Sequence, residues 1–128
     1  MPRFDPHPDR RPAIVAGASS GIGAATAIDL AAHGFPVALG ARRLDKCQEI
    51  AEKIRADGGE AIALALDVTD PESVKAFVHQ ATEQLGDIEV LVTGAGDTHF
   101  GKLHEIDTET FESQIQIHLL GANRLATA

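Results

Sequence analysis

The sequence contains no tryptophan and no tyrosine, and aromatic residues make up only 4% of its 128 positions. Its hydrophobic fraction of 44% is still large enough for a buried core, which must then be built from alanine, valine, isoleucine and leucine. Side chains of this size suit helices that pack closely on a sheet. The length predicts a single domain.

Cysteine, long apolar runs and excess positive charge are also scarce. The single cysteine, Cys47, excludes an internal disulfide and indicates a reducing, cytoplasmic setting. No apolar run approaches the roughly 20 residues that span a bilayer, so we expect no membrane segment. The 19 acidic and 11 basic residues give a net charge of −8, which argues against nucleic acid as a partner. The histidines lack ligand spacing on a common element, so no metal site is expected.

The beginning of the chain differs in composition from the rest. Residues 1–11 are polar and rich in proline, and they predict a flexible N-terminal arm. Arg10-Arg11 resembles part of a twin-arginine export signal, but the apolar run behind it is short and ends at Ser19. We therefore assign residues 12–128 to the domain itself.

The stretch from Ala13 to Gly23 has the order strand, glycine-rich turn, helix. Ala13–Ala16 is a short apolar run that predicts a buried strand, and glycines follow at positions 17, 21 and 23. Gly17 permits a sharp turn, and the missing side chains of Gly21 and Gly23 let the backbone approach a pyrophosphate. Free amides and the positive dipole end of the new helix would face this anion. The residues expected to bind a cofactor here are Gly17, Ser19, Ser20, Gly21, Ile22 and Gly23.

Helices and strands alternate through the rest of the chain. Recurring apolar residues predict helices over 22–33, 44–57, 71–85 and 108–128, and short apolar runs predict strands over 37–40, 61–66 and 88–93. This alternation predicts an α/β fold with a doubly wound, Rossmann-type parallel sheet in the strand order 3-2-1-4. The ligand crevice then lies where the first and fourth strands part.

The segment Ala41-Arg42-Arg43 follows the second strand, where dinucleotide-binding folds select their cofactor. A carboxylate at this place would hold the ribose 2′-hydroxyl of NAD, but the sequence offers two guanidinium groups instead. An arginine can meet a 2′-phosphate with two parallel hydrogen bonds. The pattern predicts NADP(H), with Arg42 as the principal contact and Arg43 beside it. The other interpretation is two arginines on a solvated helix start.

The spacing Gly-x-x-x-Gly-x-Gly at 17–23 resembles the short-chain dehydrogenase/reductase family, whose pattern is Thr-Gly-x-x-x-Gly-Ile-Gly. The resemblance implies NADP(H)-dependent interconversion of a small-molecule alcohol and a carbonyl, in a homo-oligomer (dimer or tetramer). It covers nearly all of this chain but only half of a usual member. The family's catalytic Ser and Tyr-x-x-x-Lys lie further along, so we expect no catalytic residue in these residues. We interpret the chain as the N-terminal, cofactor-binding half of a longer enzyme, inactive and unstable by itself.

The resemblance also implies roles for residues that follow the third and fourth strands. Asp67 would accept a hydrogen bond from the adenine amino group while the backbone of Val68 meets the ring. Asp67 as a helix cap is the alternative, but Asp70-Pro71 already supplies that cap. The remaining expected contacts are Ala95 and Gly96 with the cofactor, and Gln114, Ile117 and Leu120 with another subunit. From their position after the fourth strand alone, His99 and Phe100 are expected near the nicotinamide.

The sequence departs from the family pattern at three places. Ala16 stands where Thr is usual, and Thr93-Gly94 stands where Asn-Asn is usual. We expect the Thr93 hydroxyl to pair with backbone of the first strand in place of the Asn amide. His118 stands where the family has an active-site Asn, and it is either part of a proton relay or a core histidine. In the second case it shares one helix face with Phe111, Ile115, Ala122 and Leu125.

Two other functions are compatible with parts of this sequence. A non-catalytic nucleotide-sensing or scaffold protein would keep the glycine turn and lose the chemistry, and the altered Asn positions leave room for it. A methyltransferase has a related fold, but it needs an acidic residue after the second strand, which Ala41-Arg42 does not supply. Cys47 lies on the apolar stripe of its helix, which favours a packed thiol over a catalytic one.

Overall fold

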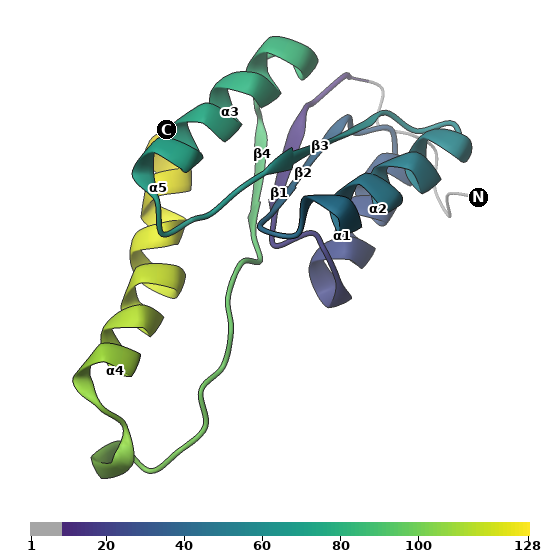
Figure 1. Ribbon diagram of the computed structural model, residues 1–128. Coiled ribbons are helices and arrows are strands. Elements are labelled where there is room, and N and C mark those ends of the chain that lie inside the picture. The colour runs from purple at the N-terminus through teal and green to yellow at the C-terminus, as the bar shows by residue number, and fades with distance from the viewer. Residues whose placement is uncertain (1–8) are drawn as a thin grey trace.

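Four parallel strands form the centre of the computed structural model, which describes residues 9–128 (Figure 1). The strands are β1 (Ala13–Ala16), β2 (Val37–Ala41), β3 (Ala61–Ala65) and β4 (Val90–Thr93). Their order across the sheet is β3-β2-β1-β4, so the predicted order 3-2-1-4 is confirmed. β1 pairs with both β2 and β4, and Ala16 lies opposite Gly40 on one side and Thr93 on the other.

Helices cover both faces of this sheet (Figure 1). α1 (Gly21–Ala32) and α2 (Leu44–Ala56) lie on one face, and α3 (Pro71–Leu85) and α5 (Gly121–Thr127) lie on the other. Successive side chains of a strand point to opposite faces, so Val15 joins the core under α1 and α2 while Ile14 joins the core under α3. The result is the predicted doubly wound α/β sandwich.

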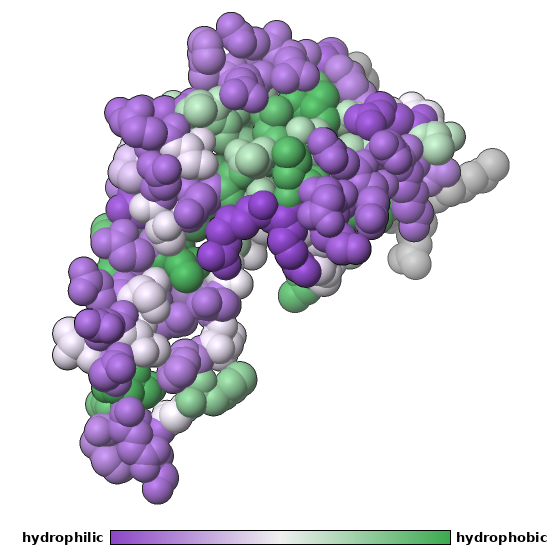
Figure 2. Space-filling view, in the orientation of Figure 1, coloured by the Kyte–Doolittle hydropathy of each residue, from purple (hydrophilic) through white to green (hydrophobic). Residues whose placement is uncertain are grey.

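The sheet is close to its helices because small residues stand at the contacts. A Cβ added to Gly40 of β2 would lie 2.6 Å from Cε2 of Phe77, which is the largest fully buried side chain. β3 is an edge strand, and Figure 2 shows hydrophobic residues gathered over it between the hydrophilic surfaces of α2 and α3. The core is otherwise aliphatic, as the composition predicts.

The predicted helix over 108–128 forms, but it is not uniform. α4 (Thr108–Gln114) runs into a π-helical segment, η2 (Ile115–Leu120), and then into α5. A π-helical turn holds more residues than an α-helical turn, so it shifts the face that the later residues present. The expected shared face is therefore wrong: Phe111 is 52% exposed and Ile115 38% exposed, whereas Leu125 is buried.

The same shift changes the surface that we expected to meet another subunit. Ile117 packs against the core under α3, and Gln114 donates to Asp97. These two side chains are therefore engaged within the chain. The exposed apolar side chains of the arm formed by α4 and η2 are instead Phe111, Ile115 and Leu119.

Most of the expected N-terminal arm, residues 1–8, lies outside the described residues. Its last two residues contact the domain. Arg10 donates to the carbonyl of Leu85 and pairs with Glu60 at 2.6 Å, and Arg11 pairs with Glu89 at 2.8 Å. Ordered contacts therefore begin before residue 12. Within residues 9–128, no helix is both long enough and apolar enough to cross a bilayer.

Candidate functional site

A cavity of about 700 Å³ opens at the carboxyl edge of the sheet. The molecule is hollowed here, between the arm of α4 and η2 and the body that carries α1 and α2 (Figure 2). Every expected cofactor residue except Gly21 lines this cavity: Gly17, Ser19, Ser20, Ile22, Gly23, Arg42, Arg43, Asp67, Val68, Ala95 and Gly96. The topology explains this, because all these residues follow the ends of parallel strands.

The glycines of the turn after β1 have different structural roles. Gly17 has φ +79°, and a Cβ there would lie 2.5 Å from the carbonyl group of Gly94. Gly21 has φ +58° and no neighbouring atom within 4 Å of an added Cβ, so its backbone is open to approach. A Cβ at Gly23 would lie 2.1 Å from the carbonyl oxygen of Gly17, so this glycine also lets α1 pack on the turn. Its expected role at a pyrophosphate stays a prediction.

The first backbone amides of α1 have no hydrogen-bond acceptor within the helix. Ser20 is the N-cap, but no side chain accepts from the first turn and no acidic residue lies in it. The first backbone bond runs from Ala24 N to Ser20 O at 3.3 Å, which leaves the amides of residues 21–23 without a helical acceptor. Ile22 is 88% exposed beside them. Free amides and the helix dipole make this end a favourable place for an anion.

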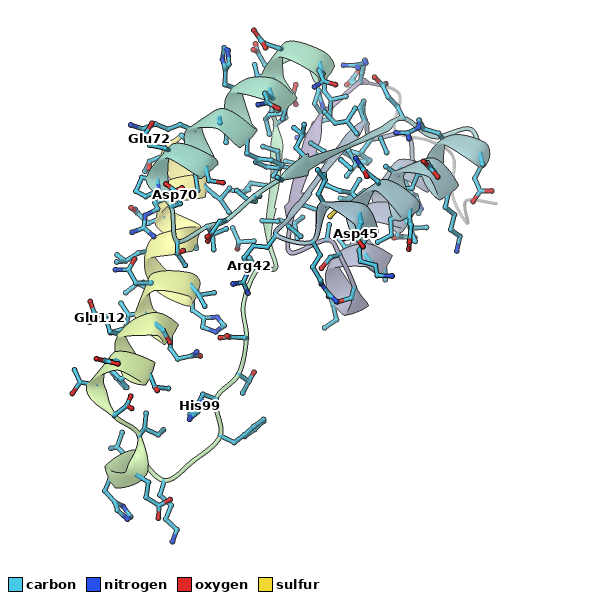
Figure 3. All side chains as sticks on the ribbon, in the orientation of Figure 1. Arg42, Asp45, Asp70, Glu72, His99 and Glu112 are labelled. Carbon is cyan, nitrogen blue, oxygen red and sulfur yellow. The ribbon has the colours of Figure 1, made fainter. Side chains whose placement is uncertain are left out.

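The two arginines after β2 behave differently. Arg43, the N-cap residue of α2, donates through Nη2 to the hydroxyl oxygens of Ser19 and Ser20, each at 3.3 Å. The backbone carbonyl of Arg42 accepts from Leu44 N at 3.1 Å, but its side chain makes no hydrogen bond or ion pair with another residue of the range 9–128. Its side chain extends from the carboxyl edge of the sheet toward the space beside the arm (Figure 3). A guanidinium group without a protein partner is therefore exposed at the cavity.

Asp67 presents an ionised carboxylate to the same cavity. Its Oδ1 accepts from Thr69 Oγ1 at 2.6 Å and from Thr69 N at 3.0 Å. These two bonds lower the pKa of Asp67, with a smaller contribution from the charge of Arg42, against a small opposing effect of burial. Asp70 accepts from Glu72 N and caps α3, as the sequence predicts, so Asp67 is not the cap.

The loop after β4 supplies the opposite wall, but not in the expected way. Gly94 N donates to Ala16 O at 2.9 Å, and this backbone bond ties the two strands beyond their pairing. The Thr93 hydroxyl makes no hydrogen bond within residues 9–128, so the expected bond to β1 is wrong. Its side chain instead borders a second cavity of about 60 Å³ that His118 also lines.

His118 is exposed and contacts this loop, so it is not a core histidine. Its Nε2 lies 2.7 Å from the carbonyl oxygen of Asp97, and Gln114 Nε2 donates to Asp97 Oδ1 at 2.7 Å. A Cβ on Gly96 would lie 2.4 Å from His118 Cε1, so the ring lies directly against that glycine. His99 and Phe100 are not among the residues that line the cavity, and Phe100 is 89% exposed, so their place near a nicotinamide stays a prediction. His99 lies on the loop after β4 (Figure 3).

Several residues of the cavity wall were not predicted: Ala41, Thr69, Gly94, Asp97 and Ile117. Ala41, Thr69 and Gly94 adjoin predicted residues at the ends of strands, so the same strand-end argument extends to them. Ile117 comes from the arm, and its place depends on the π-helical segment. The 3.6-residue periodicity of an α-helix therefore does not predict the position of Ile117.

Cys47 and the acidic residues form no further site here. Cys47 lies on the buried face of α2, and burial raises the pKa of its thiol, with smaller opposed effects of Arg43 and Asp45. It is therefore a packed thiol. Among residues 9–128, no group of three or more His, Cys, Asp or Glu side chains is arranged to hold a metal ion.

Comparisons with known proteins match this geometry. A family model described as short chain dehydrogenase matches residues 11–128. A glycine betaine reductase, ATRR, of Emericella nidulans is 42% identical over 116 residues, which make up 90% of this chain and 9% of that protein. The 3-oxoacyl-acyl-carrier-protein reductase FabG of Staphylococcus aureus is 34% identical over 85% of this chain and 45% of that protein.

The fold also matches solved structures. An alcohol dehydrogenase of the archaeon Thermococcus sibiricus, complexed with 5-hydroxy-NADP, has a TM-score of 0.89 and 38% identity over 93% of this chain. The match takes in 51% of that archaeal chain. The chain thus spans about half, or less, of the length of these relatives.

Proposed function

The chain belongs to the short-chain dehydrogenase/reductase family, and from this membership we propose that it carries the NADP(H)-binding half of an oxidoreductase. The proposed reaction interconverts a small-molecule alcohol and a carbonyl. The observation that carries the proposal is one cavity lined both by the bare start of α1 and by the unpartnered guanidinium of Arg42.

The residues present fit a dinucleotide. The open backbone at Gly21 and the amides at the start of α1 would hold the pyrophosphate. Asp67 and the backbone of Val68 would hold the adenine, and Ala95 and Gly96 would border the cofactor from the loop after β4. The nicotinamide group supplies or accepts the hydride when the cofactor is bound.

The preference for NADP(H) over NAD(H) is part of the proposal and rests on charge. Arg42 and Arg43 both line the cavity beyond β2, where a carboxylate would be needed for the ribose of NAD. Arg43 is already engaged by Ser19 and Ser20, so Arg42 is the principal contact for the 2′-phosphate. The NADP analogue in the archaeal alcohol dehydrogenase supports this choice.

The rest of the proposal concerns the full-length protein. The family's catalytic Ser, Tyr and Lys are proposed to follow the present chain, whose 128 residues contain no tyrosine. The full-length protein is proposed to be a cytoplasmic homo-oligomer, while the chain by itself is proposed to be inactive. The substrate pocket is proposed to be formed mostly by the residues that follow, together with the catalytic Ser, Tyr and Lys.

Binding of nicotinamide cofactors tests the proposal directly. We expect the full-length protein to bind NADPH more tightly than NADH, measured by the change in NADPH fluorescence and by calorimetry. Equal or tighter binding of NADH would contradict the cofactor assignment. Reduction of a panel of ketones and aldehydes, followed at the NADPH absorbance, then tests for turnover.

A non-catalytic nucleotide sensor is the second candidate. It is favoured by Thr93-Gly94 and His118, which stand where the family pattern has Asn residues. A sensor would bind NADPH without turnover toward any substrate. Ser and Tyr-x-x-x-Lys in the residues that follow would favour the enzyme.

A further inference from the structure

Two consecutive helical segments, η2 and α5, contact the two loops that form a wall of the cavity. His118 in η2 contacts Gly96 and Asp97 in the loop after β4. Three residues further on, Gly121 packs on the loop after β3, where a Cβ on the glycine would lie 2.8 Å from Val68 Cγ2. The second contact involves the loop that carries the proposed adenine-binding residues.

Arg124 completes that second contact. Its Nη1 donates to the carbonyl oxygen of Val68 at 3.1 Å, and its Nη2 donates to Gln116 Oε1 at 2.8 Å. The side chain is partly buried, and it forms no ion pair with a carboxylate of residues 9–128. These two hydrogen bonds connect the loop after β3 with η2 through one guanidinium group, and a hydrogen bond with a charged donor is stronger than one between neutral groups.

The loop that Arg124 holds has two sides. Asp67 faces the cavity, where its carboxylate is fixed by Thr69 and its backbone amide donates to Ser73 Oγ at 2.9 Å. Val68 also borders the cavity, but its side chain packs on Gly121 of α5 and the residue is only 6% exposed. Its carbonyl is the point at which Arg124 of α5 holds the loop.

We propose that Arg124 is a positioning residue for the adenine side of the cleft, acting through the carbonyl of Val68. It fixes the loop of residues 67–69 in the shape that receives the adenine ring, so less ordering remains to be done when the nucleotide binds. The proposal rests on the proposed NADP(H) function for the ligand, but the fixing of the loop itself does not.

The first test uses the protein without nucleotide. Arg124→Met in the full-length protein keeps much of the side-chain volume and removes every donor. Hydrogen exchange at Thr69 N, which is bonded to Asp67 Oδ1, should become about tenfold faster. Unchanged exchange at Thr69 in this variant would overturn the proposal.

A matched control separates positioning from loss of a buried arginine. Arg55 Nη1 donates to the carbonyl of Ala61 at 2.7 Å, at the other end of β3. Arg55→Met removes the same charge and the same type of bond, and it should leave exchange at Thr69 unchanged. An equal acceleration in both variants would mean a general loss of stability and would overturn the specific role.

The second test uses 2′,5′-ADP, which carries the adenine and the 2′-phosphate but no nicotinamide. Arg124→Met should weaken binding of 2′,5′-ADP about tenfold and weaken NADPH by the same factor. Arg124→Lys should restore most of the affinity, because an ammonium can still donate to the Val68 carbonyl. A loss with NADPH that exceeds the loss with 2′,5′-ADP would place the effect elsewhere in the cleft and overturn the proposal.

A milder variant covers the case in which Arg124→Met does not fold. Gln116→Leu removes the acceptor that orients the guanidinium and should change both readouts in the same direction by less. No change in either readout would overturn the proposal. If the unaltered protein binds neither NADPH nor 2′,5′-ADP, the proposed function fails, while the exchange comparison still decides the role of Arg124.

Discussion

Arg43 Nη2 lies 3.3 Å from the hydroxyl oxygens of both Ser19 and Ser20, so the start of α2 is fixed to the turn after β1. Arg42, the neighbour of Arg43, has no such anchor within residues 9–128 and extends into the cavity. One arginine therefore shapes the mouth of the cavity, and the other is available to a ligand.

The two arginines should differ in their effect on cofactor choice. Arg42→Ser should weaken NADPH binding on the order of tenfold or more, because charge-assisted hydrogen bonds to the 2′-phosphate are lost, and it should leave NADH nearly unchanged. Arg43→Ser should cause a smaller loss that affects both cofactors. Calorimetric titration of both variants with NADPH and NADH checks this, and a larger selective loss in Arg43→Ser would reverse the assignment.

The glycines of the turn should respond differently to alanine. Gly23→Ala places a Cβ 2.1 Å from a backbone oxygen that cannot move freely, so unfolding should become easier by about 3 kcal/mol or more. Gly21→Ala meets no atom within 4 Å, and only its positive φ is unfavourable, at about 1–2 kcal/mol. Urea unfolding of the two variants measures the difference. Equal losses would show that α1 does not pack on Gly17 as described.

The sequence alone was enough to predict the sheet order and most of the cavity wall. Residues such as Arg42 and Asp67 were found because the ends of parallel strands share one edge, whatever the details of packing. The positions of side chains on the arm of α4 and η2 could not be predicted in this way. The π-helical segment inserts an extra residue into a turn, and no apolar periodicity shows where this happens. Ile117 was therefore placed on the outside, although it packs against the core.

The Thr93 prediction failed for a similar reason. A hydroxyl near the end of a strand has several backbone acceptors within reach, and its choice depends on rotamer and on what packs beside it. The connection between β1 and β4 is supplied by Gly94 N and Ala16 O, which no side-chain pattern can indicate. The two strands are thus tied at the expected place, but by backbone atoms and not by the Thr93 hydroxyl.

Asp67 should make stability depend on pH at the acidic end. Its pKa is lowered in the folded state by the Thr69 bonds, so the ionised carboxylate stabilises the fold above its unfolded pKa of about 4. This contribution is lost as the pH falls through the lower, folded pKa. Asp67→Asn should therefore be less stable than the unaltered protein at pH 7, and the difference should shrink toward about pH 2.

Thermal unfolding at several pH values measures that dependence. Thr69→Val removes the shortest bond to Asp67 Oδ1, at 2.6 Å, and should reproduce part of the effect while keeping the charge. A stability difference between Asp67→Asn and the unaltered protein that does not vary with pH would contradict the assignment.

Cys47 should react slowly with thiol reagents while the protein is folded. Its side chain is fully buried, and the raised pKa leaves less thiolate at neutral pH than a free cysteine has. Labelling with iodoacetamide at pH 8, followed by mass spectrometry, should therefore require unfolding and should accelerate strongly in urea. Fast labelling of the native protein would show that α2 opens or that the thiol is accessible from the cavity.

His118 should act first as an anchor of the loop after β4. The carbonyl of Asp97 can only accept, so His118 Nε2 must carry the proton and is already engaged at 2.7 Å. A proton relay through that nitrogen would first have to break the bond. In the full-length protein, His118→Ala should therefore weaken NADPH binding severalfold, since the Gly96–Asp97 segment loses its contact. His118→Asn should recover part of the loss, because its amide can also donate to a carbonyl.

The proton relay makes a different prediction, for turnover. In His118→Ala, kcat would fall at saturating cofactor, with an altered pH profile and unchanged affinity. Unchanged kcat at saturation would leave the relay without support and the anchor as the role of this histidine.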